Sequence, residues 1–451
     1  MTRYAELAIT SNFSFLRGAS HPEEYAVQAA ALGLAGIGIA DRNSVAGVVR
    51  AHSVAKVHNV RLAVGARLAF ADGGTPDILA YPSDRQAWSR LTRLLSLGKQ
   101  RAEKGGCHLG LADLLDWCEG LNLIVCPPAV ADMDAALLPR LREAAPGRTW
   151  LAASHLYRGD DARRLARLAA AARNAGVPLL ATNDVHFHHP DRRALADVVT
   201  CIREHTTLDA AGRLLAVNAE RHLKSPFQME HLFREYPQAV EETLHFLGAC
   251  NFSLDQLKPS YPLERREGYA TPMDALVAYA EEGARRRYPG GVPQKIRDNL
   301  DYEYRLVADL KYAPYFLTVH EIVRFARSKG ILCQGRGSAA NSTICFCLGV
   351  TEVDPMVSGL LFERFLSAER GEPPDIDVDF EHERREEVIQ HIYDLYGRER
   401  AAMTAVTTCY RGRSAIREVC KVFGLSADVG ARLAKTLWGW SGTGVSDETA
   451  G

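Results

Sequence analysis

The sequence predicts an α/β protein in which an N-terminal β/α barrel is followed by a helical connector and an α+β region. Up to about residue 190, short apolar runs alternate with amphipathic stretches, which indicates parallel strands joined by helices. Helical periodicity with Pro and Gly punctuation dominates residues 191–293. A glycine-rich turn near residue 335 and an acidic strand near residue 377 then mark the α+β region.

The composition is that of a soluble protein: 47% of the 451 residues are hydrophobic and 24% are charged. This length suits about three domains. The net charge of −1 excludes a global basic field, so nucleic-acid contacts would come from local patches. The ten cysteines form no Cys-x-x-Cys pair, residues 1–6 do not resemble a signal peptide, and the longest apolar run, 29–40, is too short to span a bilayer. We therefore expect a cytoplasmic protein with no membrane partner.

The barrel is predicted from seven short apolar or β-branched runs separated by helical stretches. The first helix begins at a capping box at residues 20–23, with Pro22 in its first turn, and ends at Gly33. Because parallel strands end at one edge of a barrel, chemistry is expected at their carboxyl ends. The strands are predicted at residues 5–9, 36–40, 61–70, 78–81, 121–126, 150–153 and 178–182.

Polar residues follow three of these strands, at 10–12, 41–43 and 183–186. Together with the run YAELAITSNFSFLRGAS at residues 4–20, these segments resemble a polymerase-and-histidinol-phosphatase (PHP) domain. The resemblance implies a distorted β/α barrel. It also implies, for active members of the family, a metal cluster with a His-x-His pair on the first strand.

The sequence departs from that pattern at the metal ligands. Ala8 and Thr10 occupy the His-x-His positions, and neither is a useful ligand for a transition metal. Arg42 stands where a histidine is expected and Arg67 where an acidic residue is expected.

Asp41, Asp184 and His186 remain of the family's ligand set. We expect the two arginines to pair with the remaining carboxylates, because a guanidinium keeps its charge in proteins, and to leave the site degenerate and metal-free. A weakly occupied site using Asp184, His186, His188 and His189 is the alternative, and an exposed polar loop would look the same in sequence.

The middle segment, residues 191–293, carries no catalytic constellation and is interpreted as a connector. A helix is predicted to start at Thr271. Cys201 and Cys250 are expected to be core thiols rather than nucleophiles, because neither has a base at motif spacing.

A strand at residues 331–333 leads into the glycine-rich turn and then into an apolar helix at 343–348. Strand, glycine turn and helix N-terminus is an arrangement that binds phosphate. Gly335 and Gly337 would let the backbone approach the anion, Arg336 would add a charged fork, and Ser338 and Ser342 would donate hydrogen bonds. An ordinary turn is the alternative reading.

Asp375, Asp377 and Asp379 alternate with apolar residues and would share one face of a strand. Their mutual repulsion would be relieved by Mg²⁺, which prefers one or two carboxylates plus phosphate oxygens. An acidic edge strand that resists aggregation is the alternative. With the glycine turn some forty residues upstream, the pair of motifs is the minimum for two-metal phosphoryl or nucleotidyl transfer.

The segments 335–338, 361–366, 369–370 and 374–380 resemble, in order and spacing, the alpha subunit of bacterial C-family replicative polymerases. The segments 12–18, 411–414 and 438–442 are most similar to the error-prone, damage-inducible branch of that family. The resemblance implies a DNA-directed DNA polymerase that adds dNTPs to a primer 3′-hydroxyl with two Mg²⁺ ions, in translesion synthesis. It also implies primer–template DNA, a sliding clamp and mutagenesis accessory proteins as partners.

The same resemblance implies a palm of the nucleotidyltransferase type at residues 294–405 and the start of a thumb at 406–451. Asp377 and Asp379 would be the catalytic metal ligands, with Asp375 a candidate for an outer position around them. The residues expected to bind the nucleotide are Gly335, Arg336, Gly337, Ser338, Ser342, Arg364 and Arg370. For Arg364, a surface ion pair with Glu363 or Glu369 is the alternative.

A basic stretch beside Tyr410 is expected to contact the DNA backbone through Arg411, Arg413, Arg417 and Lys421, although a solvated helix face would have the same pattern. The family's third palm carboxylate would lie downstream of Gly451, so we expect that these 451 residues alone do not extend a primer. Two other functions remain to be compared, a PHP-type metallophosphoesterase and a non-catalytic module that binds DNA or a partner.

Overall fold

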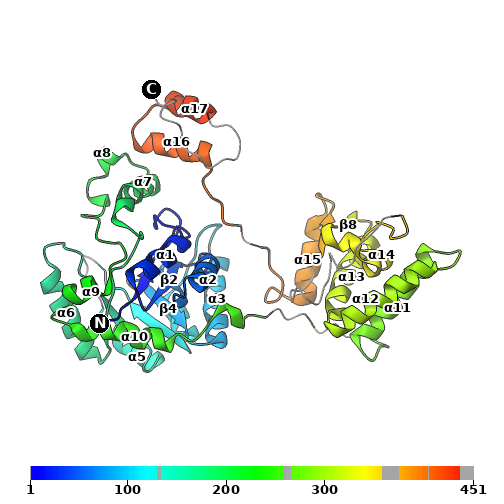
Figure 1. Ribbon diagram of the computed structural model, residues 1–451, viewed down its shortest axis with the longest axis horizontal. Coiled ribbons are helices and arrows are strands. Elements are labelled where there is room, and N and C mark those ends of the chain that lie inside the picture. The colour runs from blue at the N-terminus through cyan, green and yellow to red at the C-terminus, as the bar shows by residue number, and fades with distance from the viewer. Residues whose placement is uncertain are drawn as a thin grey trace. The chain divides into compact units, whose positions relative to one another are not determined.

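The computed structural model describes residues 2–128, 134–258, 262, 264, 266–357, 375–404 and 406–436 (Figure 1). The chain forms two compact units. The first comprises Met1–Leu257 with Val406–Gly451, and the second comprises Lys258–Ala405. The boundaries predicted at residues 190, 293 and 405 stay predictions.

A seven-stranded sheet, in the order β1 to β7, forms the centre of the first unit. Each strand lies where the sequence predicted it, within a few residues. The expectation of a parallel sheet is wrong for β4, which runs antiparallel to both β3 and β5. The link from β3 to β4, residues 69–77, contains no helix, and a parallel pair needs a longer crossover. The strands are β1 (Ala5–Ile9), β2 (Gly36–Arg42), β3 (Leu62–Leu68), β4 (Ile78–Pro82), β5 (Leu121–Val125), β6 (Thr149–Ala153) and β7 (Leu179–Ala181).

The sheet curls so that its two ends meet beyond β1 and β7. Ile9 forms a parallel bridge with Val185, and the Val185 N–H donates to the Ala8 carbonyl at 2.8 Å. The sheet therefore forms a distorted barrel, as the sequence predicted.

Helix α10 (Pro237–Ala249) covers the end of the barrel where β1 and β2 begin. Its Thr243 accepts a hydrogen bond from the Ala5 N–H at 3.2 Å, and Phe246 packs edge-on against Tyr81 and Trp150. A Cβ at Gly36 would lie 2.7 Å from the Leu247 side chain of α10 and 2.8 Å from the Arg61 carbonyl oxygen, and the backbone contact makes glycine necessary there. Part of the predicted connector thus completes the core of the barrel.

Helices cover the outside of the barrel and continue beyond it (Figure 1). Near the end of the described chain, α16 packs against α7, where Cys201, Ala211 and Val422 form a small core. The other elements of this unit are α1 (Pro22–Leu32), α2 (Val48–Val57), α3 (Arg85–Gln100), α4 (Leu111–Trp117), α5 (Leu137–Ala144), α6 (Asp161–Ala175), η1 (Pro190–Arg192), α7 (Arg193–Glu204), α8 (Leu208–Ala211), η2 (Gly212–Leu214), α9 (Pro226–Leu232), η3 (Leu254–Gln256), α16 (Gly412–Val422) and α17 (Ala427–Thr436).

The second unit packs helices against a two-stranded antiparallel sheet. Its core is formed by apolar residues of α11, α12, α13 and α14, and Ile376 and Val378 pack against it from the acidic segment. The elements are α11 (Pro272–Arg287), α12 (Gln294–Asp309), α13 (Ala313–Ser328), β8 (Cys333–Arg336), η4 (Gly337–Asn341), α14 (Thr343–Cys347), β9 (Asp377–Phe380) and α15 (Arg385–Tyr396).

Among the helices of the described residues, none is both long enough and apolar enough to cross a membrane.

Candidate active site

The acidic segment forms β9, which pairs antiparallel with β8 so that Asp377 lies opposite Arg336 and Asp379 opposite Gln334. The side chains alternate as predicted. Asp377 and Asp379 are exposed, whereas Val378 and Phe380 are half-buried against the core. Asp375, just before the strand, is exposed as well. The carboxylates of Asp377 and Asp379 therefore share the solvent face of the sheet.

Arg336 ends β8 and reaches across to this face. Its Nε donates to Asp379 Oδ2 at 2.6 Å, and the two side chains remain 70% and 54% exposed. Exposed ion pairs of this kind contribute about 0–1 kcal/mol to stability. A metal ion at Asp379 or a phosphate at Arg336 could therefore replace this contact at little cost.

The glycine turn needs both of its glycines. The Gly335 N–H donates to the Val350 carbonyl at 2.6 Å, and a Cβ at Gly335 would lie 2.7 Å from that oxygen. Gly337 has a φ of +64°, which side chains other than glycine rarely adopt. Ser338, the next residue, donates its hydroxyl to the Asp375 carbonyl at 3.0 Å. The turn and the acidic segment are thus joined directly.

The helix start after the turn differs from the sequence-based prediction. Ser342 is fully buried and donates its hydroxyl to Glu303 at 2.8 Å, while the N–H groups of Thr343 and Ile344 donate to the same carboxylate at 2.7 and 3.0 Å. The donors predicted for phosphate at Ser342 and the helix N-terminus are therefore already used within the protein. Sequence reasoning missed Glu303, although it occupies a core position of α12 between Leu300 and Val307.

The predicted residues of the PHP site lie around the mouth of the barrel. Asp41 is buried and accepts hydrogen bonds from the Ser11 N–H at 2.8 Å and from the hydroxyls of Ser11 and Ser14 at 2.7 Å each. Burial raises the pKa of Asp41, and the serine hydrogen bonds oppose that shift. Ala8 and Thr10 are buried as well.

Asp184 lies between two guanidinium groups. Arg67 donates to its Oδ1 at 2.5 Å, and Arg221 contacts its Oδ2 and donates from Nε to its backbone carbonyl at 2.9 Å. Burial would raise the pKa of Asp184, but Arg221 and Arg67 hold it well below its usual value. The predicted pairing of Arg67 with a leftover carboxylate is present, and Arg221 is an additional partner that the sequence did not reveal.

Two neighbours complete this network. The pairing predicted for Arg42 with a leftover ligand carboxylate is wrong, because Arg42 faces Asp77 at 3.4 Å. Arg67 also faces Asp77, at 3.6 Å. Burial and the nearby Arg221 lower the pKa of His186 well below its usual value, so this imidazole is neutral. Within the described residues, no group of three or more His, Cys, Asp or Glu side chains is arranged to hold a metal ion.

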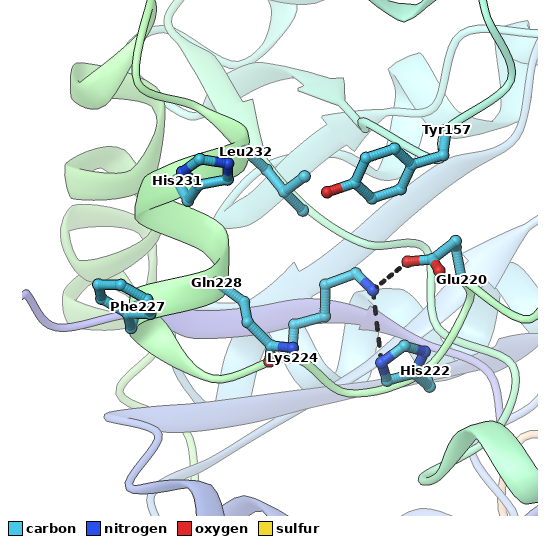
Figure 2. A pocket seen from close by; sticks show the side chains of 8 residues that line it. All are labelled: Tyr157, Glu220, His222, Lys224, Phe227, Gln228, His231 and Leu232. Atoms are coloured by element: carbon cyan, nitrogen blue, oxygen red, sulfur yellow. Dashed lines mark hydrogen bonds and ion pairs between the residues drawn. The ribbon is translucent and has the colours of Figure 1, made fainter.

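A pocket of about 450 Å³ lies beside α9 and is shown in Figure 2. Its only lysine, Lys224, is almost completely buried and binds Glu220 Oε2 at 2.6 Å and His222 Nε2 at 3.4 Å (Figure 2). Because Glu220 neutralises the ammonium group, we interpret this lysine as a structural ion-pair partner. Cys201 and Cys250 are both buried, and burial raises the pKa of Cys250 to about 12, so both thiols are unsuited to nucleophilic chemistry.

The remaining predicted residues fall into two groups. Arg364 and Arg370 lie outside the described residues, as do the segments 361–366 and 438–442. The basic residues of α16 and of the segment before it are all exposed, and Lys421 also binds Glu418 at 2.7 Å. This group comprises Arg411, Arg413, Arg417 and Lys421.

Comparison with known proteins identifies two families in the chain. Residues 6–185 match the PHP domain, and residues 274–450 match the family described as the bacterial DNA polymerase III alpha NTPase domain. At the level of structure, an amidohydrolase from Chromobacterium violaceum covers 41% of this chain with 18% sequence identity and a TM-score of 0.30, and 88% of that protein is matched. A sequence identity and a TM-score this low support no inference about function.

Sequence relatives are much closer. The error-prone DNA polymerase of Sinorhizobium medicae is 55% identical over 452 residues, which cover 100% of this chain and 40% of the relative. Error-prone DNA polymerase 1 of Rhizobium meliloti is 56% identical, over 99% of this chain and 40% of its own length. The error-prone DNA polymerase of Caulobacter vibrioides is 53% identical, over 99% of this chain and 41% of its own length.

This chain thus spans about 40% of the length of these curated relatives. The two family matches do not overlap, and together they include the barrel, the glycine turn and the acidic strand. The sequence similarity extends through both matched regions and the connector between them. The chain therefore combines a PHP domain with a domain of the bacterial DNA polymerase III alpha family, and along its whole length it is similar to error-prone DNA polymerases.

Proposed function

We propose that this chain carries the nucleotide- and metal-binding part of a DNA-directed DNA polymerase that acts in error-prone translesion synthesis. The observation that carries the proposal is the β8–β9 pairing, which sets Asp377 and Asp379 on the exposed face beside Arg336 and the Ser338 turn. Because the chain spans about 40% of its relatives, primer extension is proposed for the whole protein.

The carboxylates of Asp377 and Asp379 fit a divalent cation. They are exposed and lie on one strand face two residues apart, and the Arg336 contact to Asp379 is itself exposed. Oxygen ligands of this kind suit Mg²⁺, which keeps the rest of its shell for water and phosphate. Bound Mg²⁺ would supply charge neutralisation at the triphosphate and at the attacking hydroxyl. Asp375, whose backbone carbonyl binds Ser338, would support this face from the side.

The residues of the turn would bind and orient the triphosphate. Arg336 would leave Asp379 and donate to phosphate oxygens, for which its planar fork is suited. The N–H groups of the turn at Gly337 and Ser338 would add hydrogen bonds, since their glycine backbone permits close approach. Ser342 is buried on Glu303 and takes no part in this proposal. Arg364 and Arg370 remain proposed phosphate ligands on the family resemblance alone.

The exposed basic residues around α16 are proposed to contact the DNA backbone. Arg411, Arg413, Arg417 and Lys421 are all accessible to solvent, as such contacts require. A sliding clamp and mutagenesis accessory proteins are proposed partners, and the cytoplasm the proposed location, on resemblance alone. A PHP-type phosphoesterase is disfavoured, because Asp184 is held by Arg67 and Arg221.

The experiment that tests the function is primer extension by the whole protein with Asp377→Asn or Asp379→Asn. We expect each substitution to lower templated, Mg²⁺-dependent incorporation by at least about a hundredfold, since a catalytic metal ligand supplies several kcal/mol in the transition state. Asp298→Asn, an exposed carboxylate on α12, is the control and should change little. Equal incorporation by all variants would indicate a non-catalytic DNA- or partner-binding module instead.

A further inference from the structure

Glu303 is a carboxylate in the core of the second unit. It lies on the buried face of α12, in line with Leu300 and Val307, and is 2% exposed. A buried carboxylate is unfavourable unless hydrogen bonds compensate for the water it has lost. The bonds that Glu303 makes all go to one short segment, the residues that follow the glycine turn.

Three donors converge on this carboxylate. The Ser342 hydroxyl and the Ile344 N–H reach Oε2 at 2.8 and 3.0 Å, and the Thr343 N–H reaches Oε1 at 2.7 Å. The two N–H groups belong to the first turn of α14, where backbone donors have no partner within the helix. Glu303 therefore satisfies donors that would otherwise be buried and unpaired, and it fixes the start of α14.

The segment between these bonds and β8 is short. Arg336 ends β8, η4 occupies Gly337–Asn341, and Ser342 follows directly. At the upstream end the Gly335 N–H is bound to the Val350 carbonyl, and at the downstream end Ser342 is bound to Glu303. The turn that carries Arg336 and Ser338 is thus anchored at both ends. At the downstream end Glu303 accepts the shorter bonds, and Asn299 donates to the Thr343 hydroxyl at 3.4 Å.

We propose that Glu303 is a positioning residue for nucleotide binding: its carboxylate anchors the backbone at Ser342–Ile344 and thereby holds Arg336 and Ser338 where they can receive a triphosphate. This inference rests on the proposed function. It adds a group that does not touch the nucleotide and whose removal should weaken nucleotide affinity through the turn.

The anchor needs the ionised form of Glu303. A proton on either oxygen would face a donor, since Oε1 accepts from the Thr343 N–H and Oε2 accepts from the Ile344 N–H and the Ser342 hydroxyl. Burial raises the pKa of Glu303 to about 7, against the lowering effect of the Ile344 and Thr343 hydrogen bonds. The anchor therefore titrates near neutral pH, and it weakens as the pH falls below that value.

No cation assists this carboxylate among the described residues. The titratable groups near it are Cys345 and Cys347 of α14 and Tyr304 of α12. Glu281 of α11 lies near Cys347 and Tyr304. Burial raises the pKa of both thiols and of the phenol, so these three groups are neutral at physiological pH. The ionised state of Glu303 is thus supported by the hydrogen bonds of the anchored segment alone.

The test is calorimetric binding of dATP with Mg²⁺ to this chain and to its Glu303→Gln variant, across about pH 6 to 8.5. We expect the substitution to weaken affinity about tenfold at the alkaline end, which corresponds to the loss of one well-made hydrogen-bonded contact. In the unmodified chain, affinity should fall as the pH drops through about 7, and the variant should lack this step. The nucleotide's own titration is common to both and cancels in the difference.

Asp298→Asn removes an exposed carboxylate from the same helix and is the matched control, with unchanged affinity expected. Amide hydrogen exchange at Thr343 and Ile344 provides a readout of the anchor itself, and it should be faster in Glu303→Gln. If that variant does not fold, Ser342→Ala, which removes one donor and keeps the carboxylate, should give a smaller loss of affinity in the same direction.

The outcomes separate the two proposals. If the unmodified chain binds no dATP with Mg²⁺, the proposed function of the turn is contradicted, and the positioning role with it. If the unmodified chain binds and Glu303→Gln binds equally well with the same pH profile, only the positioning role of Glu303 is overturned, and the residue is a packing element of the core.

Discussion

Arg336 and Asp379 are in direct contact, with the guanidinium Nε 2.6 Å from the carboxylate Oδ2 across the β8–β9 pair. The first of these residues is proposed to bind phosphate and the second to bind metal. The two side chains are exposed, so their ion pair is weak and can exchange for a ligand. This contact therefore couples the two halves of the proposed site, and it leads to a prediction with opposite signs for two ligands.

Replacing Arg336 with Ala should raise the affinity of this chain for Mn²⁺ alone, by about two- to fivefold, because Asp379 loses a competing cation. The same substitution should lower the affinity for dATP with Mg²⁺, because the triphosphate loses its charged fork. Calorimetry with each ligand measures both effects. Arg285→Ala, an exposed arginine of α11, is the control. A variant in which both affinities move in the same direction would rule out the shared contact.

Asp184→Asn should destabilise the first unit by about 3 kcal/mol, because Arg221 would lose its carboxylate partner and Arg67 would keep only Asp77 at 3.6 Å. The pKa of Asp184 in the folded protein is held well below its usual value of 3.8, so its contribution is complete above that pH and declines as the pH falls further. Urea unfolding at neutral pH and near pH 3 measures the difference between protein and variant. A difference that stays constant down to pH 3 would contradict the ion-pair account.

Added Mn²⁺ or Zn²⁺ should not create phosphoesterase activity at the barrel mouth. Asp184 is engaged by two guanidinium groups, and Asp41 by Ser11 and Ser14. Hydrolysis of a chromogenic phosphodiester by this chain, with and without each metal, is the measurement. Metal-dependent turnover that is lost in the Asp184→Asn variant would contradict this prediction and would support a PHP-type phosphoesterase.

Gly335→Ala should destabilise the second unit by about 1–3 kcal/mol and lower dATP affinity, because the new methyl group would meet the Val350 carbonyl at 2.7 Å. Gly290→Ala is the matched control, since nothing lies within 4 Å of a Cβ at that position. Thermal unfolding and nucleotide binding of the two variants should therefore differ clearly. If both behaved alike, the close approach at Gly335 would not be what holds the turn.

Most of the fold could be predicted from the sequence because its local signals agree. Apolar runs coincide with the strands, and the alternation in the acidic segment correctly separated Asp377 and Asp379 from Val378 and Phe380. What could not be predicted depends on contacts distant in sequence. The reversed direction of β4 and the packing of α10 on the barrel are examples of this kind.

For the candidate site too, contacts between residues distant in sequence could not be predicted. The residue types at β8 and β9 indicated phosphate and metal binding, but the pattern could not reveal that Glu303, some forty residues before the helix start, takes the donors expected for phosphate. The contact of Arg221 with Asp184 could not be predicted either, because only the fold brings these two residues together. In both cases the missing partner was a charged side chain distant in sequence.

The central claim is that Asp377 and Asp379 hold a divalent cation together with a nucleotide on the face beside Arg336. The most direct measurement is electron paramagnetic resonance of Mn²⁺ bound to this chain in the presence of dATP, compared with the Asp377→Asn, Asp379→Asn double variant. The account predicts that bound Mn²⁺ depends on dATP and that its affinity falls by at least about tenfold in the double variant. Mn²⁺ binding with dATP that is undiminished in the double variant would contradict it.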